Sequence, residues 1–241
     1  MKVNTIIHNE NHVITFGCRL NIYESQIIKN NLAKVGNQEI IVINSCAVTN
    51  EAELEAKKAI RKIKKQQPEK KIIVTGCAAQ KDPKTFSSMP EVDKIIGNEE
   101  KLLAESYHFD DERVIVSDIM QVKKISPHLI TKFDNRVRAF VQVQNGCNHR
   151  CTFCTIPYGR GNSRSMPIGM IAKQISQLVE SGYREVVLTG VDLTAYGQDL
   201  PGSPTFAQMI RRVLLLVPTL PRLRLSSIDV ADIDSDLKII F

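Results

Sequence analysis

Short apolar segments recur along the first half of the chain, and longer amphipathic stretches separate them. The short segments are rich in β-branched residues and are bounded by turn residues, which is typical of buried parallel strands. They cover 13–16, 40–43, 72–74, 92–96 and 113–117. Because strands alternate with helical stretches, the pattern predicts an α/β fold with a doubly wound, flavodoxin-like parallel sheet.

The stretches between these segments have helical spacing. Helices are expected at about 21–35, 50–67 and 98–107. The first ends at Gly36, a good C-terminal cap. The second begins with Asn50 and has Glu53 three residues later, as in a capping box, and it ends before Pro68. Its apolar stripe consists of Ala52, Ala56, Ala59, Ile60 and Ile63.

The chain becomes polar between 118 and 135, where Pro127 interrupts it and no periodicity is visible. Such a stretch is typical of an interdomain linker. We therefore expect a first domain at 9–120, a linker at 121–135 and a second domain at 136–241. In the second domain, strands are expected at 138–144, 185–189 and 222–226, and helices at 167–181 and from Asp234 onward.

Composition narrows the class of protein. Of the 241 residues, 43% are hydrophobic and 24% are charged, and the longest apolar run, 213–217, is far shorter than the roughly 18 residues of a membrane span. The first ten residues contain no secretory h-region, so we expect a cytoplasmic protein without a membrane partner. The net charge of +6 is compatible with a polyanionic partner. The basic run at 57–71 is interpreted as a solvated helix face, because no aromatic residue interrupts it.

Six cysteines fall into two groups of three. Cytoplasmic thiols stay reduced, so metal binding or catalysis explains them better than disulfides do. Cys18, Cys46 and Cys77 each follow one of the first three expected strands. Ligands bind at the carboxyl ends of the strands in such sheets, so a shared site is expected there. The alternative is three unrelated buried cysteines.

The second group, Cys147, Cys151 and Cys154, forms a C-x3-C-x2-C loop. Three thiolates can ligate three irons of a 4Fe-4S cluster, which leaves the fourth iron open to a cofactor. S-adenosylmethionine chelated at that iron accepts one electron and yields a 5'-deoxyadenosyl radical. Two alternatives stay open, a zinc site that recruits His149 and a redox pair of Cys151 and Cys154.

Further motifs surround the cysteines. In the first half they are Gly17–Asn21 with Glu24 and Ser25, Asn44–Thr49 and Thr75–Gln80. In the second half they are Asn145–Cys154, Ile156–Gly161, Ser163–Ser165, Leu188–Leu193 and Arg224–Asp229. Together they resemble the radical S-adenosylmethionine methylthiotransferases, and within that family the enzymes that modify threonylcarbamoyladenosine 37 of tRNA.

The resemblance implies two 4Fe-4S clusters and S-adenosylmethionine as cofactors. Cys147, Cys151 and Cys154 would hold the radical-generating cluster, exchangeable with S-adenosylmethionine. The auxiliary 4Fe-4S cluster, which takes part in sulfur delivery, would be held by Cys18, Cys46 and Cys77. The implied reaction adds a methylthio group to position 2 of N6-threonylcarbamoyladenosine 37 in the tRNA anticodon loop. Sulfur and electron donors are the other implied partners.

Three further residues are assigned to S-adenosylmethionine. Gly190 and Asp192 follow an expected strand at the place where the wider superfamily binds the amino group of its cofactor. Arg160 lies in a loop with Arg164, and either can contact a carboxylate or a tRNA phosphate. A turn glycine, a helix-capping aspartate and solvent-exposed loop arginines are the ordinary alternatives.

The second domain supplies only about half of the six βα units that the resemblance implies. We therefore expect a partial, truncated radical S-adenosylmethionine (βα) barrel that holds the cofactor or tRNA poorly alone, with a separately encoded C-terminal half as a further partner to test for. The alternatives are action on isopentenyladenosine 37 or on a ribosomal protein, and an inactive iron-sulfur or zinc-binding fragment. A flavin-binding electron carrier is disfavoured, because Gly17–Asn21 lacks the features of a phosphate loop.

Overall fold

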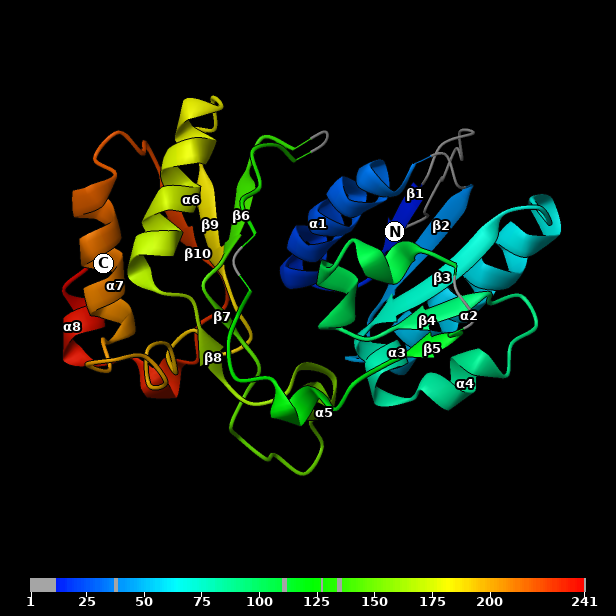
Figure 1. The fold of residues 1–241 in the computed structure, drawn as a ribbon. Helices are drawn as coiled ribbons and strands as arrows, with labels where there is room; N and C mark the ends of the chain where they lie inside the picture. The colour runs from blue at the N-terminus through cyan, green and yellow to red at the C-terminus, as the bar shows by residue number, and fades with distance from the viewer. Residues whose placement is uncertain (1–11, 37–38, 110–111, 127, 134–135, 241) are drawn as a thin grey trace. The chain divides into compact units, whose positions relative to one another are not determined.

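The structure is a computed structural model that describes residues 12–36, 39–109, 112–126, 128–133 and 136–240 (Figure 1). The chain divides into two compact units, Met1–Asp118 and Ile119–Phe241, and each is described by itself. None of the helices in these ranges is long and apolar enough to cross a membrane.

The first unit is built on a five-stranded parallel sheet. Its strands are β1 (His12–Thr15), β2 (Ile40–Ser45), β3 (Lys71–Gly76), β4 (Lys94–Ile96) and β5 (Val114–Ile115), and their order in space follows the chain. The register places Thr15 beside Asn44 and Asn44 beside Thr75, so β1, β2 and β3 end at the same edge. This confirms the expected parallel α/β sheet.

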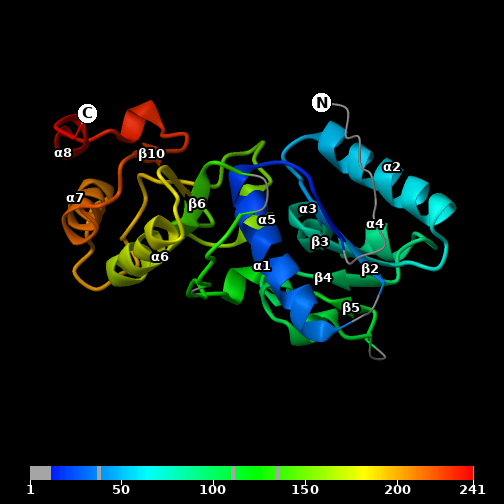
Figure 2. The same ribbon diagram turned by 90° about the horizontal axis from the view of Figure 1, so that it is seen from above.

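Helices cover both faces of this sheet. Helix α1 (Arg19–Val35) buries Ile28 and Leu32 against one face, where Val42 of β2 lies. Helix α2 (Asn50–Gln66) buries Ile60 and its neighbours against the other face, where Ile43 lies. Successive residues of β2 therefore serve two separate cores, as expected for a strand buried on both sides. Figure 2 shows α1 and α2 on opposite sides of the sheet.

Two expectations for the first unit need correction. The helix expected at 98–107 is replaced by two short 3-10 turns, η1 (Glu100–Leu102) and η2 (Glu105–Tyr107). Lys101 and Tyr107 are both fully buried here, and side chains six residues apart lie on different faces of one α-helix. The cap of α2 is Thr49, whose hydroxyl accepts from the Ala52 N–H, rather than Asn50. The short helices α3 (Cys77–Lys81) and α4 (Pro83–Ser87) complete the unit.

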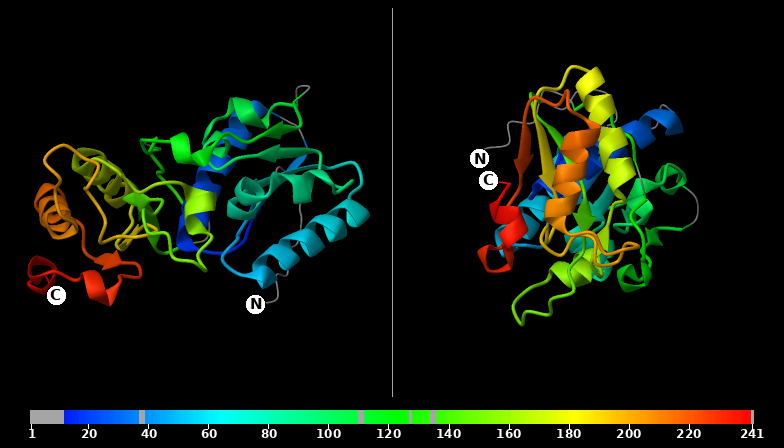
Figure 3. Two further views of the ribbon diagram at one scale, coloured as in Figure 1. Left: turned by 90° about the horizontal axis from the view of Figure 1, so that it is seen from below. Right: turned by 90° about the vertical axis from the view of Figure 1, so that its left-hand side faces the viewer.

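The second unit contains a three-stranded parallel sheet in the order β10-β9-β6. Its strands are β6 (Ala139–Gln142), β9 (Val186–Thr189) and β10 (Leu223–Leu225). Helices α6 (Ile168–Glu180) and α7 (Phe206–Leu216) pack on each other, side by side in Figure 3, and α6 also packs on β6. The strand-helix-strand alternation confirms a partial βα arrangement, although α7 was not among the expected helices.

The strand expected at 138–144 is divided in two. After β6 the chain leaves the parallel sheet, and β7 (Gln144–Asn145) pairs antiparallel with β8 (Arg164–Ser165). This pairing brings the loop between β7 and α5 (Ile156–Arg160) beside the residues that precede β8. The remaining elements are η3 (Ile119–Gln121), η4 (Val230–Asp232) and α8 (Ser235–Lys238).

The described part of 121–135 packs on the second unit. Ile130 and Phe133 are buried, and the Ile130 N–H donates to Oε1 of Gln174 on α6 at 2.8 Å. The Phe133 N–H donates to the Tyr183 hydroxyl at 2.7 Å, and the two rings meet edge to face. This segment is therefore anchored to α6 and to the residues that follow it.

Candidate functional site

The first three cysteines lie at the carboxyl ends of three adjacent strands. Cys18 caps α1, Cys46 follows β2 directly, and Cys77 begins α3 immediately after β3. A Cβ added to Gly17 would lie 2.5 Å from Cys46 Sγ, so the turn before Cys18 touches the Cys46 thiol. Cys18 is exposed, Cys77 half-buried and Cys46 buried. The structure thus brings these three cysteines to one edge of the sheet, as the sequence predicts.

Buried amides tie the loop after β1 to the end of β2. The Asn21 side-chain amide donates to the carbonyls of Phe16 at 2.7 Å and Ser45 at 3.0 Å. The Asn44 side-chain amide donates to the Asn21 carbonyl at 3.0 Å and to the Ser25 hydroxyl at 2.9 Å. Both asparagines are fully buried, so these bonds satisfy groups that are costly to leave unpaired. The network fixes the positions of Cys18 and Cys46 relative to each other.

Gly76 allows β3 to approach β2 closely before Cys77. Its φ is +93°, which favours glycine, and a Cβ there would overlap the Ser45 backbone carbonyl. The Ser45 hydroxyl donates to the Thr75 carbonyl at 2.5 Å and accepts from the Ala79 N–H at 3.3 Å. A side chain at position 76 would therefore clash with the end of β2, so the turn before Cys77 could not keep this close approach.

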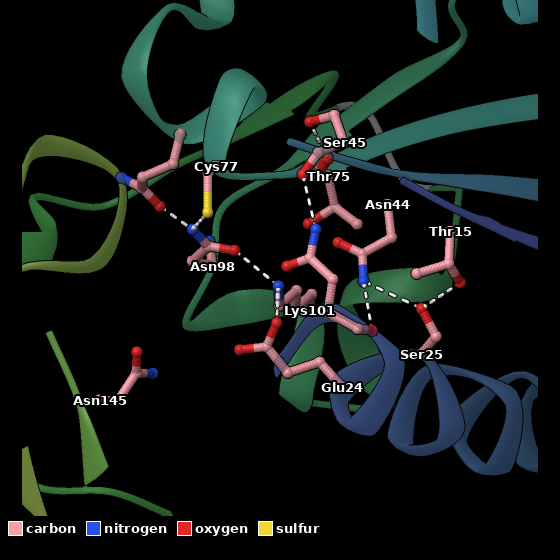
Figure 4. Close-up of polar contacts among 12 residues, drawn as sticks. Thr15, Glu24, Ser25, Asn44, Ser45, Thr75, Cys77, Asn98, Lys101 and Asn145 are labelled. Atoms are coloured by element: carbon pink, nitrogen blue, oxygen red, sulfur yellow. Dashed lines mark hydrogen bonds and ion pairs between the residues drawn. The ribbon is translucent and has the colours of Figure 1, made fainter. Parts of the chain in front are cut away.

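A chain of polar contacts runs from Cys77 to α1 (Figure 4). The Asn98 side-chain amide lies 3.8 Å from Cys77 Sγ, and its carbonyl oxygen accepts from Lys101 Nζ at 2.6 Å. Lys101 Nζ also pairs with Glu24 Oε2 at 2.7 Å. Sequence reasoning missed Asn98 and Lys101. Asn98 follows Gly97, but neither residue has a cysteine beside it to mark a metal-binding motif. Lys101 is fully buried, which its charge does not suggest.

The second group of cysteines lies within one loop, between β7 and α5. The Cys147 N–H donates to the Gly161 carbonyl at 3.1 Å, and the Cys154 N–H donates to the Cys151 carbonyl at 3.0 Å. Cys151 is exposed, and the other two are half-buried. The ring of Phe153, which precedes the last cysteine, is 88% exposed. This group is therefore placed by local backbone geometry at the surface of its own unit.

Side chains of the same loop hold its backbone in shape. Arg150 donates to the Cys147 carbonyl at 2.8 Å and to Asn162 Oδ1 at 2.6 Å. Asn148 Oδ1 accepts from the Ser163 N–H at 2.9 Å. These bonds join the cysteine loop to the segment that leads into β8.

Asp192 faces the first cysteine of the loop. Its Oδ2 atom lies 3.8 Å from Cys147 Sγ and 3.4 Å from His149 Nε2. Burial raises the pKa of the Cys147 thiol, a bond from the His149 N–H opposes the shift, and the Asp192 carboxylate adds to it. One ligand atom from each of these three residues lies within 4.8 Å of the others. The structure therefore places this mixed set of donors, among the described residues, close enough together for a single metal ion.

A buried glutamine joins the cysteine loop to the loop after β9. Gln144 Oε1 accepts from the N–H groups of Val191 at 2.9 Å and Asp192 at 2.8 Å. Its side-chain amide donates to the Gly146 carbonyl at 2.7 Å. Gly190 lies against the same side chain, because a Cβ added there would be 3.0 Å from Gln144 Oε1. Gln144 was not predicted from the sequence. The one signal that could have indicated it is its position just before the cysteine loop.

Neither of the two arginines lies in a loop as expected, since Arg160 ends α5 and Arg164 begins β8, and both are buried. Arg160 is 2% exposed and Arg164 is 3% exposed, so the alternative that they are solvent-exposed is wrong. The Arg164 guanidinium donates to the carbonyls of Arg160 and Asn162, both at 3.0 Å. Arg164 therefore has a structural function in closing the segment after α5.

Both groups of cysteines fit an iron-sulfur cluster by the chemistry of their donors. Each offers three thiols, whose thiolates are the soft ligands that iron-sulfur clusters take. Three ligands leave one iron of a four-iron cluster without a protein donor. The first group lies in the first unit and the second group in the second unit.

Two family models match separate parts of the chain. Residues 10–97 match uncharacterized protein family UPF0004, and residues 141–232 match the radical SAM superfamily. The first match contains Cys18, Cys46 and Cys77, and the second contains the other three cysteines. Each group of cysteines thus belongs to a different matched family.

Relatives match nearly the whole chain. It is 60% identical over 236 residues to threonylcarbamoyladenosine tRNA methylthiotransferase MtaB of Rickettsia prowazekii, which covers 97% of this chain and 56% of the relative. It is 35% identical to the protein of that name from Bacillus subtilis, covering 92% of this chain and 52% of the relative. The chain spans about half the length of these relatives.

A solved structure shares the fold. The radical S-adenosylmethionine methyltransferase TsrM from Kitasatospora setae matches 97% of this chain and 57% of its own, with a TM-score of 0.62 and 13% identity. At that identity the likeness concerns the fold alone, and it agrees with a parallel α/β sheet followed by a partial radical SAM fold. The two family models and the relatives place this chain, by its sequence, close to the radical S-adenosylmethionine methylthiotransferases named threonylcarbamoyladenosine tRNA methylthiotransferase.

Proposed function

We propose that the chain takes part in adding a methylthio group to position 2 of N6-threonylcarbamoyladenosine 37 in tRNA. The observation that carries this proposal is the 60% identity, over 97% of the chain, to a relative named for that substrate. Two groups of three cysteines, one in each unit, support it, because the reaction needs both radical chemistry and sulfur delivery. We place the reaction in the cytoplasm, with tRNA and with sulfur and electron donors as partners.

The radical SAM superfamily implies a 4Fe-4S cluster and S-adenosylmethionine. We assign Cys147, Cys151 and Cys154 to this cluster, because their loop is held by its own backbone and leaves Cys151 accessible. The chemistry supplied when the group is bound is one-electron cleavage of S-adenosylmethionine. The three cysteines would fix the position of the cofactor sulfonium relative to the loop after β9.

Gly190, Asp192 and Arg160 are our candidates for binding S-adenosylmethionine. Gly190 and Asp192 lie on a loop that Gln144 holds beside the first cysteine. The Asp192 carboxylate would accept hydrogen bonds from the cofactor amino group. Arg160 is a candidate from the sequence alone, because its side chain is only 2% exposed in the structure. These are binding roles, and neither residue transfers a proton in the proposal.

Cys18, Cys46 and Cys77 are assigned to an auxiliary 4Fe-4S cluster. Their placement at three adjacent strand ends supports a shared ligand, and the buried amides of Asn21 and Asn44 hold that arrangement. We propose that the domain with this cluster covers 9–120, that 121–135 is a linker and that 136–241 supplies the radical chemistry.

Mass spectrometry of tRNA nucleosides tests the proposal. Cells that lack the gene should contain threonylcarbamoyladenosine without the methylthio group, and expression of the chain together with the C-terminal half of a full-length relative should restore the methylthio form. An unchanged methylthio content after deletion contradicts the proposed substrate. Restored methylthio-isopentenyladenosine, or a modified ribosomal protein, assigns the chain to another substrate of the family.

A zinc-binding module is the second candidate. The observation that favours it is the set of Cys147, His149 and Asp192, whose ligand atoms lie within 4.8 Å of one another. Sulfur, nitrogen and carboxylate oxygen are a donor set that suits zinc. Metal analysis of the chain purified without oxygen separates the candidates. Iron with acid-labile sulfide supports the radical enzyme, and stoichiometric zinc without visible absorption supports the zinc module.

A further inference from the structure

We propose that Asn98 is a positioning residue for the auxiliary cluster, and that Lys101 and Glu24 hold it in the required orientation. The side-chain amide of Asn98 would donate a hydrogen bond to the Cys77 sulfur and so raise the reduction potential of the cluster. This inference rests on the proposed assignment of Cys18, Cys46 and Cys77 to a cluster. Asn98 is not itself a metal ligand and belongs to none of the cysteine motifs.

Asn98 is fixed at the end of β4, beside the strand that leads to Cys77. Its backbone N–H donates to Gln80 Oε1 at 2.7 Å, and the Gln80 amide donates to the Ser117 carbonyl at 2.9 Å. The Thr75 hydroxyl donates to the Gly97 carbonyl at 3.3 Å, which ties β3 to the residue before Asn98. The backbone of Asn98 therefore keeps a constant position relative to Cys77.

The orientation of the Asn98 amide follows from its partner. Lys101 Nζ lies 2.6 Å from one terminal atom of Asn98, and an ammonium group can only donate hydrogen bonds. That terminal atom must therefore be the carbonyl oxygen. The amide nitrogen is then the atom that faces Cys77 Sγ, at 3.8 Å (Figure 4). The ammonium therefore disfavours the flipped amide, in which the oxygen would face the sulfur.

Lys101 is itself held by a buried carboxylate. Glu24 Oε2 lies 2.7 Å from Lys101 Nζ, and the two side chains are 2% and 0% exposed. Desolvation largely offsets the attraction within a buried ion pair, and an apolar pair of equal volume is often as stable. Stability alone therefore does not explain the pair, whereas orientation of the Asn98 amide does. Glu24 lies on α1, the helix that Cys18 caps, so the contacts join the surroundings of two of the three cysteines.

A hydrogen bond to a ligand sulfur affects the charge that a cluster can accept. One-electron reduction adds negative charge to the cluster and its thiolates, and a donor at sulfur stabilises that state. Removing the donor should lower the midpoint potential without removing a ligand. An acidic side chain in its place should lower the potential further, because it brings a negative charge to the sulfur.

The test uses the full chain with Cys147, Cys151 and Cys154 changed to alanine, so that only the auxiliary site can hold a cluster. After anaerobic reconstitution, the midpoint potential is measured by dithionite titration followed by electron paramagnetic resonance. We expect Asn98→Leu to lower the potential at unchanged iron content and Asn98→Asp to lower it more. Asn30→Leu, at an exposed position of α1, is the matched control and should leave the potential unchanged.

Each outcome decides between distinct claims. Equal potentials in the parent chain, Asn98→Leu and Asn98→Asp, with full iron content, overturn the inference and leave the proposed function intact. A parent chain that binds no iron overturns the auxiliary cluster and, with it, this inference. If Asn98→Leu loses iron while its far-ultraviolet circular dichroism is unchanged, the result supports positioning of Cys77 by Asn98.

Discussion

The two groups of cysteines reach similar donor sets by opposite routes. Cys18, Cys46 and Cys77 come from the ends of three strands and are adjacent only because the sheet pairs those strands. Cys147 and its two partners lie within eight residues of one loop. The first group therefore depends on long-range pairing, and the second depends mainly on local backbone bonds.

The surroundings of the two groups differ in the same way. Buried side chains support the first group, among them the amides of Asn21 and Asn44 and the ion pair of Glu24 with Lys101. The second group is supported mainly by backbone bonds and by Arg150, whose side chain is exposed, with Gln144 as a buried side chain beside the loop. We conclude that substitutions which destabilise the fold of the first unit should displace Cys18, Cys46 and Cys77. The second group should be displaced mainly by substitutions in or beside its own loop.

The largest expected effect separates the chemistry of the two groups. Cys151→Ala should abolish reductive cleavage of S-adenosylmethionine, because its loop is assigned to the radical cluster. Cys46→Ala should leave cleavage to 5'-deoxyadenosine measurable while it abolishes sulfur transfer. The measurement is single-turnover 5'-deoxyadenosine formation by the reconstituted chain with dithionite. Cleavage that survives Cys151→Ala, or that vanishes in Cys46→Ala, would show that the two assignments are exchanged or shared.

Breaking the buried ion pair should affect the first unit strongly. Lys101→Met removes the ammonium group that pairs with the buried Glu24 carboxylate, and breaking a buried ion pair in this way costs about 3–5 kcal/mol of unfolding free energy. Urea unfolding, followed by the reaction of the buried Cys46 thiol with a disulfide reagent, measures this loss. The matched control is Lys58→Met on the exposed face of α2, which should change the stability by less than about 0.5 kcal/mol. Equal midpoints for the two variants would contradict the structural importance of the pair.

Close packing of β3 on β2 predicts a smaller effect. Gly76 and Gly182 share a φ of +93°, but only Gly76 has atoms within 4 Å of an added Cβ. Gly182→Ala should therefore cost only the conformational strain, about 1–2 kcal/mol, and Gly76→Ala should cost more. Thermal or urea unfolding of the two variants measures the difference. A Gly76→Ala chain as stable as Gly182→Ala would mean that the strand ends are not in close contact.

The smallest expected effect lies in the second unit, far from any cysteine in sequence. Burial raises the pKa of Glu185, but bonds and charges from Arg222, Arg138 and Arg224 outweigh it and hold the pKa below its ordinary value of 4.5. The ionised Glu185 carboxylate therefore stabilises the folded state fully at pH values above its unfolded-state pKa. That stabilisation is lost as the pH falls through its lower folded-state pKa. Glu185→Gln should destabilise the chain at pH 7 but much less below about pH 4.

Urea midpoints at several pH values measure that difference. Glu180→Gln, at an exposed position of α6, is the control for the loss of one charge from the same unit. A stability difference between wild type and Glu185→Gln that stays constant with pH would contradict the ionic role of the cluster around Glu185.

Periodicity and turn residues account for most of what the sequence predicts correctly. The five parallel strands, α1 up to Gly36 and the apolar stripe of α2 follow from local pattern, because each residue's burial repeats with the period of its element. The helix expected at 98–107 fails because Lys101 and Tyr107 both turn inward, and only the tertiary contacts of Glu24 explain the buried lysine. No local pattern marks that contact.

In the candidate sites, too, features that depend on local sequence were predicted and features that depend on distant partners were not. Cysteine spacing is visible in the sequence, so all six positions are predicted and the structure brings the first three to one sheet edge. Gln144, Asn98 and Lys101 were not predicted, because their functions depend on partners that are distant in the chain. The burial of Arg160 was not predicted either, since an arginine between two glycines is typical of an exposed loop.

Counting iron separately in the two units tests the central claim most directly. One chain has Cys18, Cys46 and Cys77 changed to alanine, and the other has Cys147, Cys151 and Cys154 changed. After anaerobic reconstitution, each should hold about four irons and four sulfides, and the unaltered chain should hold about eight of each. Zinc in place of iron, or full iron content in one altered chain and none in the other, would contradict the account that each unit binds its own cluster.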